Sequence, residues 1–286
     1  MIQIRFRYLE SISMKKSVTK YYSKQRRGPV CLWSNELVLG DRLTRLLAAL
    51  YAPSGDGVDV LKESLRRCVL RVNNYSDDLS SFIIKGFPLK KFESRLKYHK
   101  YGLAEAYNYM RAQEFNLSIP KCYGYFEQSG LFGTVKANGA LIEDLGGYAT
   151  LDDQVQAFPE QRLPILNKAI PVMAQLFKTG VNHIDMSPHN LMESSDGDRV
   201  VLIDWQYCSF VAAEDVKQLV FQAAQFLRYT DLSEGGPGWS AWLWALYEAC
   251  SPSIEWELFS QNVARVQSMK RASIKDRLSL TLDLCG

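Results

Sequence analysis

The sequence predicts an α+β protein with two lobes, a small β-rich first lobe and a larger helical second lobe. Between residues 56 and 142, short apolar runs of strand length alternate with turn residues. After residue 143, apolar residues recur mostly at helical spacing. The exception is an apolar run at 200–203 that ends at Asp204. We therefore divide the 286-residue chain into a basic N-terminal extension with a short helix (1–55), the first lobe (56–142) and the second lobe (143–286).

The composition is typical of a globular protein without a membrane span. Apolar residues make up 47% of the chain and charged residues 23%. No apolar run approaches the ~20 residues that cross a bilayer, and the N-terminus shows no signal-peptide core. Six cysteines occur without a C-x-x-C pair, which favours reduced, mostly buried thiols and a cytoplasmic location over disulfides or zinc. These are Cys31, Cys68, Cys122, Cys208, Cys250 and Cys285.

The charge is unevenly distributed although the net charge is only +3. Residues 1–100 hold 20 Lys and Arg against 9 Asp and Glu, whereas residues 101–286 hold 14 against 22. A basic front favours an anionic membrane surface or an anionic substrate on that side, although these cations could simply be solvated. We expect no nucleic-acid partner.

The first lobe begins with a short helix at 41–52, which Asp41 is expected to cap. Strands are predicted at 58–62, 68–72 and 81–87. The third strand carries Lys85. A lysine in such a place is usually a solvated edge charge.

A helix is predicted from Leu96 to about Phe115. Its apolar stripe consists of Leu103, Ala106, Tyr107 and Met110. Glu105 lies on the opposite face, so it can meet Lys85 only if that face also turns inward; Glu114 is the alternative.

Two further strands, 119–126 and 132–142, lead to the segment Glu143-Asp144-Leu145-Gly146-Gly147. An apolar strand that breaks here is typical of a hinge between lobes. The backbone carbonyl of Glu143 and the N–H of Leu145 could then bind the edge of an adenine, or the segment could be a plain exit from the strand.

The second lobe is predicted to hold helices at 159–179, at 239–250 and 254–269, and from Asp215 onward. The first of these should end at Gly180. Asp215 either interacts favourably with the positive N-terminal end of its own helix, or its carboxylate accepts N–H groups of the loop that contains Asp185 and fixes that loop.

The main candidate catalytic and metal-binding residues lie between residues 181 and 205. His183-x-Asp185 is followed by Asn190 and then, after a predicted turn and strand, by Asp204-Trp205. Asp and Asn alone often cap helices and make turns. Together in this order they predict phosphoryl transfer, in which Mg²⁺ is held by hard oxygen ligands and a carboxylate accepts the proton of the acceptor hydroxyl.

With Lys85, Glu105, the hinge and these residues in hand, the chain resembles the protein-kinase-like superfamily over about residues 56–230. Within it, the stretches LIEDL, GVNHID and VVLIDW are similar in kind to those of the lipopolysaccharide core kinases, which phosphorylate heptose or Kdo sugars. The resemblance implies that Asp185 is the base, that Asn190 and Asp204 hold Mg²⁺, and that Lys85 with Glu105 orients the phosphates of ATP. The residues alone leave GTP open as the donor.

Three departures from ordinary protein kinases bear on the substrate. The turn Glu63-Ser64-Leu65-Arg66-Arg67 stands where a glycine-rich lid is usual, and its arginines either contribute charge or face solvent. Ile184 replaces an arginine, and no Ala-Pro-Glu follows Asp204. The last two departures disfavour a regulated protein kinase.

The resemblance thus implies a sugar kinase of the lipopolysaccharide core, peripheral at the cytoplasmic face of the inner membrane. The core oligosaccharide, or another hydroxyl acceptor, would be its partner. An anionic surface would meet the N-terminal tract and Lys90, Lys91, Arg95, Lys97 and Lys100. Three alternatives remain open: a phosphotransferase for aminoglycoside- or choline-like molecules, an atypical protein kinase, and an inactive scaffold, which the missing glycines favour slightly.

Overall fold

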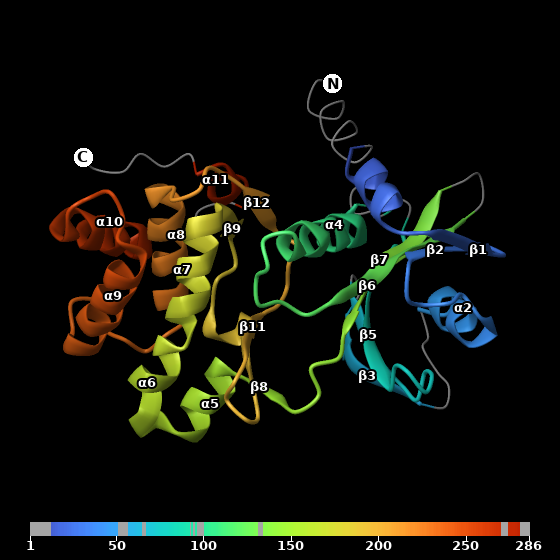
Figure 1. The fold of residues 1–286 in the computed structure, drawn as a ribbon, viewed down its shortest axis with the longest axis horizontal. Helices are drawn as coiled ribbons and strands as arrows, with labels where there is room; N and C mark the ends of the chain where they lie inside the picture. Colours follow the sequence, from blue (N-terminus) through green and yellow to red (C-terminus); the bar gives the residue numbers. More distant parts are fainter. Residues whose placement is uncertain are drawn as a thin grey trace. The chain divides into compact units, whose positions relative to one another are not determined.

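The computed structural model describes residues 13–50, 57–64, 67–91, 93, 95, 100–130, 134–269 and 274–280. The chain divides into two compact units (Figure 1). Unit 1 comprises residues 1–111 and 120–144, and unit 2 comprises residues 112–119 and 145–286. Predictions for residues 1–12, Leu65, Arg66, Lys97 and Cys285 lie outside the described residues.

Unit 1 is built on one antiparallel sheet of seven strands in the order β1-β2-β6-β7-β5-β4-β3. Its strands are β1 Lys24–Arg27, β2 Val30–Ser34, β3 Val58–Glu63, β4 Cys68–Asn73, β5 Ser81–Pro88, β6 Cys122–Ser129 and β7 Val135–Glu143. The three strands expected between residues 58 and 87 are therefore present. The strands expected from 119 and 132 begin later, at Cys122 and Val135.

The edge of this sheet contains residues that were expected to belong to the N-terminal extension. Residues 24–34 were expected to lie outside the first lobe, yet they form β1 and β2, and β2 pairs with β6. All five residues of β2 are buried. The apolar run at 30–33 is the signal in the sequence, and its neighbouring cations obscured it. Residues 13–20 are helical.

One face of the sheet is covered by α2 (Asp41–Ala48), which buries Leu43, Leu46 and Leu47. They join a core cluster with strand residues such as Leu70 and Phe82. Asp41 does not cap this helix.

The N-cap of α2 is Gly40, without a side-chain cap, and the Asp41 carboxylate instead lies 2.6 Å from the guanidinium of Arg27. The prediction of an Asp41 cap is wrong because the helix begins at Asp41 itself, one residue earlier than that role requires.

Unit 2 is largely helical, as expected. Its helices are α5 Leu151–Ala157, η2 Pro159–Gln161, α6 Arg162–Asn167, α7 Ala169–Thr179, η3 Pro188–Asn190, α8 Val216–Leu227, α9 Pro237–Cys250, α10 Trp256–Ser268 and α11 Ile274–Ser279. Its short strands are β8 Tyr148–Thr150, β9 Val181–His183, β10 Leu191–Ser194, β11 Val200–Leu202 and β12 Cys208–Phe210. The single helix expected at 159–179 is thus η2, α6 and α7.

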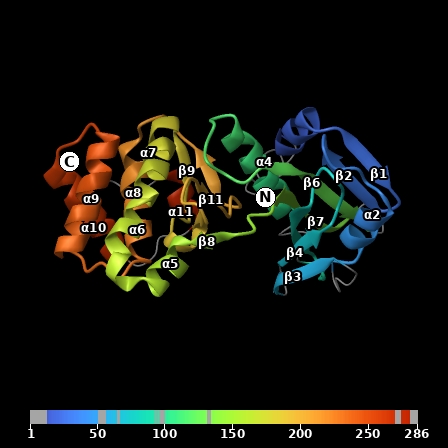
Figure 2. The same ribbon diagram turned by 60° about the horizontal axis from the view of Figure 1, so that its bottom comes forward.

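The helical core of unit 2 lies among α7, α8, α9 and α10, which run beside one another in both ribbon views (Figures 1 and 2). Phe226 of α8 stacks on Trp242 of α9 with ring centroids 4.7 Å apart. Aromatic pairs of this kind stabilise a fold beyond the contribution of the surface area that they bury. The β-rich unit 1 and the helical unit 2 confirm the predicted α+β class.

The five described cysteines form no disulfides, and all except the half-buried Cys208 are buried. Burial raises the pKa of the Cys122 and Cys250 thiols to about 12. Thiols in this state are protonated and inert at neutral pH. For the described residues, this confirms the expectation that the thiols are mostly buried.

The opposite face of the sheet in unit 1 carries α4 (Tyr101–Gln113). Alternation along β5 directs Phe82 and Ile84 toward α2, so Lys85 points toward α4. Gly102 allows α4 to approach closely. A Cβ at Gly102 would lie 2.5 Å from Gly139 Cα. The backbone N–H of Gly102 donates to Asn138 Oδ1 at 3.0 Å. Helix and strand backbones therefore meet at a point where neither residue has a side chain.

Replacing Gly102 with alanine should consequently destabilise unit 1. The added methyl group must push α4 away from β7, and overpacking of this kind costs about 1–3 kcal/mol. Urea unfolding followed by circular dichroism measures the change. Gly40→Ser is the matched control, because a Cβ at Gly40 meets nothing within 4 Å and serine is a good N-cap. Equal stability of the two variants would contradict the packing argument.

Candidate active site

The 181–204 segment of unit 2 begins where α7 ends. Gly180 has φ +69°, and a Cβ there would lie 2.4 Å from the carbonyl oxygen of Val211. Only glycine fits such a place without strain. The predicted end of the helix at Gly180 is therefore confirmed, and the chain turns directly into β9, which pairs with β12.

The Asp185 loop (residues 184–190) follows β9. The Asn190 side-chain amide donates to the Asp185 carbonyl at 2.8 Å and lies 3.5 Å from the Asp185 carboxylate. The backbone carbonyl of Asn190 accepts from the N–H of Ile203 at 2.9 Å. The predicted hairpin of β10 and β11 is present, and it returns the chain from Asn190 to Asp204. Unit 2 thus brings Asp185, Asn190 and Asp204 into one hydrogen-bonded segment.

His183 ties the two ends of this segment together. Its ring is fully buried, and Nε2 lies 3.1 Å from the carbonyl oxygens of both Ile203 and Asp204. A ring nitrogen that meets two acceptors carries the proton, so the other nitrogen is deprotonated in the neutral ring. Burial lowers the pKa of His183, against the opposing effect of the Asp204 and Asp185 carboxylates. The ring also packs edge-on against Trp205 with centroids 5.2 Å apart.

Asp204 adopts a backbone conformation that few residues tolerate. Its φ is +62°, in the left-handed region. It is separated from the end of β11 only by the half-buried Ile203. Asp is one of the non-glycine residues that enter this region more easily. Residues held in such a conformation concentrate at functional sites.

The Asp185 loop is held by side chains that the sequence did not single out. Arg277 of α11 is buried, and its Nη1 donates to the carbonyl oxygen of Ile184 at 2.6 Å. The Arg277 carbonyl in turn accepts from the Asn182 amide at 3.0 Å. Gln218 and Gln222 of α8 both donate to the carbonyl oxygen of Val181. No local pattern in the sequence connects residue 277 with residue 184, which are 93 positions apart.

The two roles considered for Asp215 can now be distinguished. Its Oδ1 accepts from the backbone N–H of Lys217 at 2.8 Å and of Gln218 at 3.4 Å. Asp215 is therefore the N-cap of α8. Gln218, in the first turn of this helix, donates to the carbonyl oxygens of Leu176 in α7 and Val181 in β9.

In unit 1, Lys85 and Glu105 form a buried ion pair with Nζ and Oε1 2.5 Å apart. The side chains are 8% and 0% exposed, so Lys85 is not the solvated edge lysine that its position allowed. β5 lies in the middle of the sheet, between β4 and β7. Both faces of α4 are buried along its middle, which explains why Glu105 turns inward.

Two other helix predictions need correction. Tyr107, expected in the apolar stripe of α4, is only half-buried, whereas Tyr109 is fully buried. Glu114, the alternative partner of Lys85, is exposed and lies beyond the end of α4.

The predicted hinge coincides with the boundary between the units, which falls between Asp144 and Leu145. β7 ends at Glu143, whose carboxylate accepts from the N–H of Lys121 at 2.9 Å. The Asp144 carboxylate lies 2.9 Å from Arg71 Nε and is 7% exposed. This ion pair fixes the end of β7 to β4, a role that sequence reasoning missed because Arg71 is remote in the chain.

The turn between β3 and β4 is the one expected to stand in place of a glycine-rich lid. The N–H of Ser64 donates to the Arg67 carbonyl at 2.8 Å, and the Arg67 N–H donates to Ser64 Oγ at 3.1 Å. The Arg67 guanidinium lies 5.9 Å from the ring centroid of Phe87. Arg67 therefore lies across an aromatic ring of β5.

The residues fit a magnesium nucleotide by the chemistry of their donors. Mg²⁺ is usually held by one or two protein oxygens, while phosphates and water complete its six ligands. Because the Asn190 amide nitrogen donates to Asp185, the amide oxygen is directed elsewhere. Asp204 supplies a carboxylate from the same segment. No cluster of three or more His, Cys, Asp or Glu side chains suited to a metal occurs among the described residues.

A β-rich unit followed by a helical one, with this loop and hairpin in the second, defines the class of protein-kinase-like folds. The structure of WaaP in complex with acyl carrier protein shares this fold, with a TM-score of 0.51 over 81% of this chain and 99% of that chain. The two sequences are 16% identical, so the likeness shows the fold alone. No protein-family model and no curated protein matches the sequence.

If Arg277 holds the Asp185 loop, Arg277→Met should loosen it. A hydrogen bond to a charged group contributes about 1.5–3 kcal/mol, so local amide exchange should speed up about tenfold or more. Hydrogen exchange read by mass spectrometry over residues 182–190 measures this.

Arg228→Met is the matched control for that experiment. Arg228 also donates to backbone carbonyls, those of Val266, Gln267 and Met269 near the end of α10. Its loss should leave exchange at 182–190 unchanged. Equal effects of both variants on this peptide would mean that Arg277 acts only through general stability.

Proposed function

We propose that this protein is an ATP-dependent kinase that transfers the γ-phosphate to a sugar hydroxyl of the lipopolysaccharide inner core. The observation that carries the proposal is the 181–204 segment, in which a carboxylate, an amide and a second carboxylate share one hydrogen-bonded framework. A protein without phosphoryl-transfer activity has no need of two hard metal ligands next to a potential base. The motifs that resemble lipopolysaccharide core kinases support the sugar acceptor.

Each residue of the segment has one role in this proposal. Asn190 and Asp204 would hold Mg²⁺, which would supply positive charge next to the phosphates of ATP. Asp185 accepts the proton of the acceptor hydroxyl while the oxygen of that hydroxyl forms a bond to the γ-phosphorus. The bond from that phosphorus to the bridging oxygen of ADP breaks in the same displacement. His183 does not react; it fixes the backbone that carries Asp204.

Unit 1 supplies the residues that orient the nucleotide. Lys85 contacts the phosphates and is kept in place by Glu105. A buried ion pair contributes little net stability, so its presence at full burial favours a functional reason. The backbone carbonyl of Glu143 and, from unit 2, the N–H of Leu145 bind the adenine edge in this proposal.

The short chain segment between Asp204 and α8 favours a small acceptor molecule over a protein acceptor. Only residues 205–215 separate Asp204 from α8, and 208–210 of these form β12, which pairs with β9. A phosphorylation-controlled activation loop needs a longer segment than this. The acceptor is therefore proposed to be a glycan hydroxyl and not a serine or threonine of a docked protein.

Replacing Asp185 and Asp204 separately should give two different kinetic results. Asp185→Asn removes the proton acceptor, so turnover should fall by about two orders of magnitude or more while Mg·ATP binding persists. Asp204→Asn removes a metal ligand, so Mg·ATP binding itself should weaken. Labelled γ-phosphate transfer and nucleotide titration calorimetry measure the two effects.

The acceptor panel for these assays comprises dephosphorylated lipopolysaccharide, an aminoglycoside mixture and a generic protein substrate. We expect label in the lipopolysaccharide alone. Label in another acceptor would retain the kinase and reject the sugar. Wild-type turnover by Asp185→Asn would reject its role as the base, and bound ATP without transfer to any acceptor would favour a scaffold.

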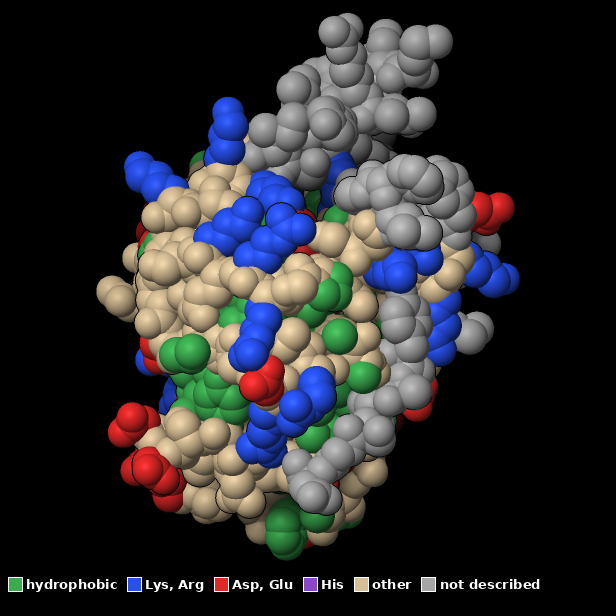
Figure 3. Space-filling model, turned by 90° about the vertical axis from the view of Figure 1, so that its right-hand side faces the viewer, with side chains coloured by type: hydrophobic (Ala, Val, Ile, Leu, Met, Phe, Trp, Pro, Cys, Tyr) green, Lys and Arg blue, Asp and Glu red, His purple; other side chains and the backbone are tan. Residues whose placement is uncertain are grey.

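We also propose that unit 1 meets an anionic membrane surface. Figure 3 shows a face of this unit on which Lys and Arg side chains outnumber carboxylates. Among the described residues of the N-terminal tract, the exposed cations are Lys16, Lys20, Lys24, Arg26 and Arg27. Among the described residues, no helix has the length and apolar character needed to cross a bilayer.

Charge reversal should test the membrane surface directly. Lys16→Glu with Lys20→Glu reverses two exposed charges one helical turn apart, and each Lys near such a surface contributes about 1 kcal/mol. Binding to phosphatidylserine vesicles should weaken at least tenfold and should also weaken with added salt. Lys178→Glu with Lys217→Glu in unit 2 makes the same change in net charge. Salt-insensitive binding, or equal loss in both double variants, would contradict this prediction.

A further inference from the structure

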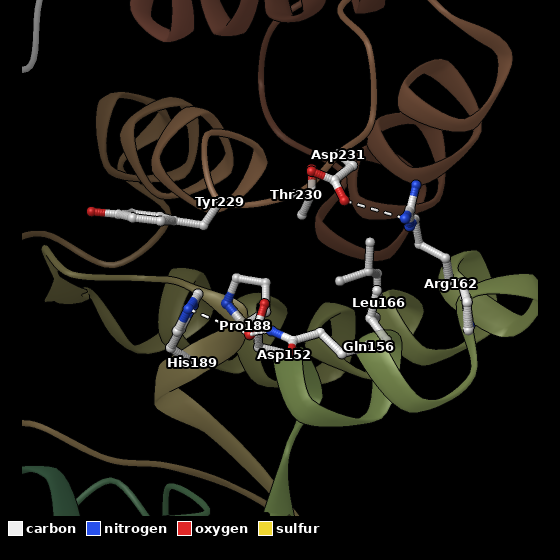
Figure 4. A pocket seen from close by; sticks show the side chains of 11 residues that line it. Asp152, Gln156, Arg162, Leu166, Pro188, His189, Tyr229, Thr230 and Asp231 are labelled. Carbon is white, nitrogen blue, oxygen red and sulfur yellow. Dashed lines mark hydrogen bonds and ion pairs between the residues drawn. The ribbon is translucent and has the colours of Figure 1, made fainter.

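A pocket of about 450 Å³ lies within unit 2, beside the Asp185 loop. Figure 4 shows Tyr229 and His189 on one side of it and Arg162 with Asp231 on the other. Pro188 and His189, which belong to the Asp185 loop, form part of its wall. One wall is therefore built from the residues immediately before Asn190. The volume is within the range of small-molecule sites, about 300–1,000 Å³.

The polar groups of the pocket already form ordered pairs. The Asp152 carboxylate accepts from the Gln156 amide at 2.6 Å and lies 3.4 Å from His189 Nε2. Arg162 lies 3.2 Å from the Asp231 carboxylate. Each carboxylate retains further lone pairs that can accept from a ligand. The pocket therefore presents hydrogen-bond acceptors and donors at both ends.

The charge balance selects the class of ligand. An anionic group would need cations that carboxylates do not already neutralise, and a cationic amine would need carboxylates without cationic partners. In this pocket Arg162 is paired with Asp231, so no cation is left for an anionic group. Asp152 accepts from the uncharged Gln156 amide and lies 3.4 Å from His189. Hydroxyl groups, which both donate and accept, suit these groups better than an anion does, and a cationic amine is the competing ligand.

Tyr229 adds the apolar element that a sugar ring requires. Its side chain is 38% exposed, and its ring lies 5.9 Å from that of His189 at an angle of 69°. A sugar ring has a C–H face that can pack on an aromatic face while its hydroxyls reach the polar groups around it. The pocket thus combines one aromatic surface with two sets of paired polar groups.

We propose that this pocket binds a neutral sugar of the acceptor next to the residue that receives phosphate. This inference rests on the proposed function, because it places an acceptor saccharide beside the loop that holds the base. Tyr229 and Gln156 contact the sugar as specificity residues and take no part in the transfer.

The test is calorimetric binding, without nucleotide, of a delipidated and dephosphorylated heptose oligosaccharide to the full chain. Tyr229→Ala and Gln156→Ala should each weaken binding about five- to tenfold, whereas Tyr229→Phe should retain it. Trp244→Ala is the control, since it removes another exposed aromatic side chain of unit 2 that does not line the pocket. Circular dichroism confirms that each variant is folded.

The outcomes separate this inference from the proposed function. Oligosaccharide binding that depends on Tyr229, with no phosphoryl transfer, would retain the pocket and reject the kinase. Transfer with an unchanged acceptor KM in Tyr229→Ala and Gln156→Ala would retain the kinase and reject the pocket. No binding by the wild-type protein, or tighter binding of an aminoglycoside or of the phosphorylated oligosaccharide, would also reject it.

Discussion

The candidate site depends on how buried backbone carbonyl groups around the Asp185 loop find hydrogen-bond donors. A loop that enters the interior cannot satisfy its carbonyls by regular pairing, and each unsatisfied buried group costs about 1–3 kcal/mol. Here side chains provide the donors: Gln218 to Val181, Arg277 to Ile184 and Asn190 to Asp185. Residues 184–187 can therefore hold one conformation without belonging to a helix or a sheet.

His183 extends the same solution to the other side of the hairpin. Its neutral ring donates to the carbonyls of Ile203 and Asp204, so the position of Asp204 follows from that of β9. A charged imidazole in this fully buried place would carry a desolvation penalty, which agrees with the lowered pKa. The carboxylates on either side are thus placed by a group that does not itself need to titrate.

The sequence predicted well what depends on neighbours in the chain. The strands of unit 1, the end of α7 at Gly180 and the hairpin after Asn190 follow from turn residues and apolar runs. It failed where remote residues decide. Arg277, the Arg71–Asp144 ion pair and the pocket at Tyr229 bring together positions far apart in the chain. The buried strand β2 was missed because the basic residues around it dominate the local composition.

Glu105 shows why a local pattern could not settle one site residue. The apolar stripe of α4 predicted one buried face, but the approach at Gly102 and Gly139 buries a second face. Glu105 lies on that face, where a carboxylate is tolerated because Lys85 meets it at 2.5 Å. Two glycines distant in the sequence therefore make the ion pair possible. A helix that must bury a charge needs both a partner across the contact and backbones close enough to reach it, and the second requirement is visible only in the packed structure.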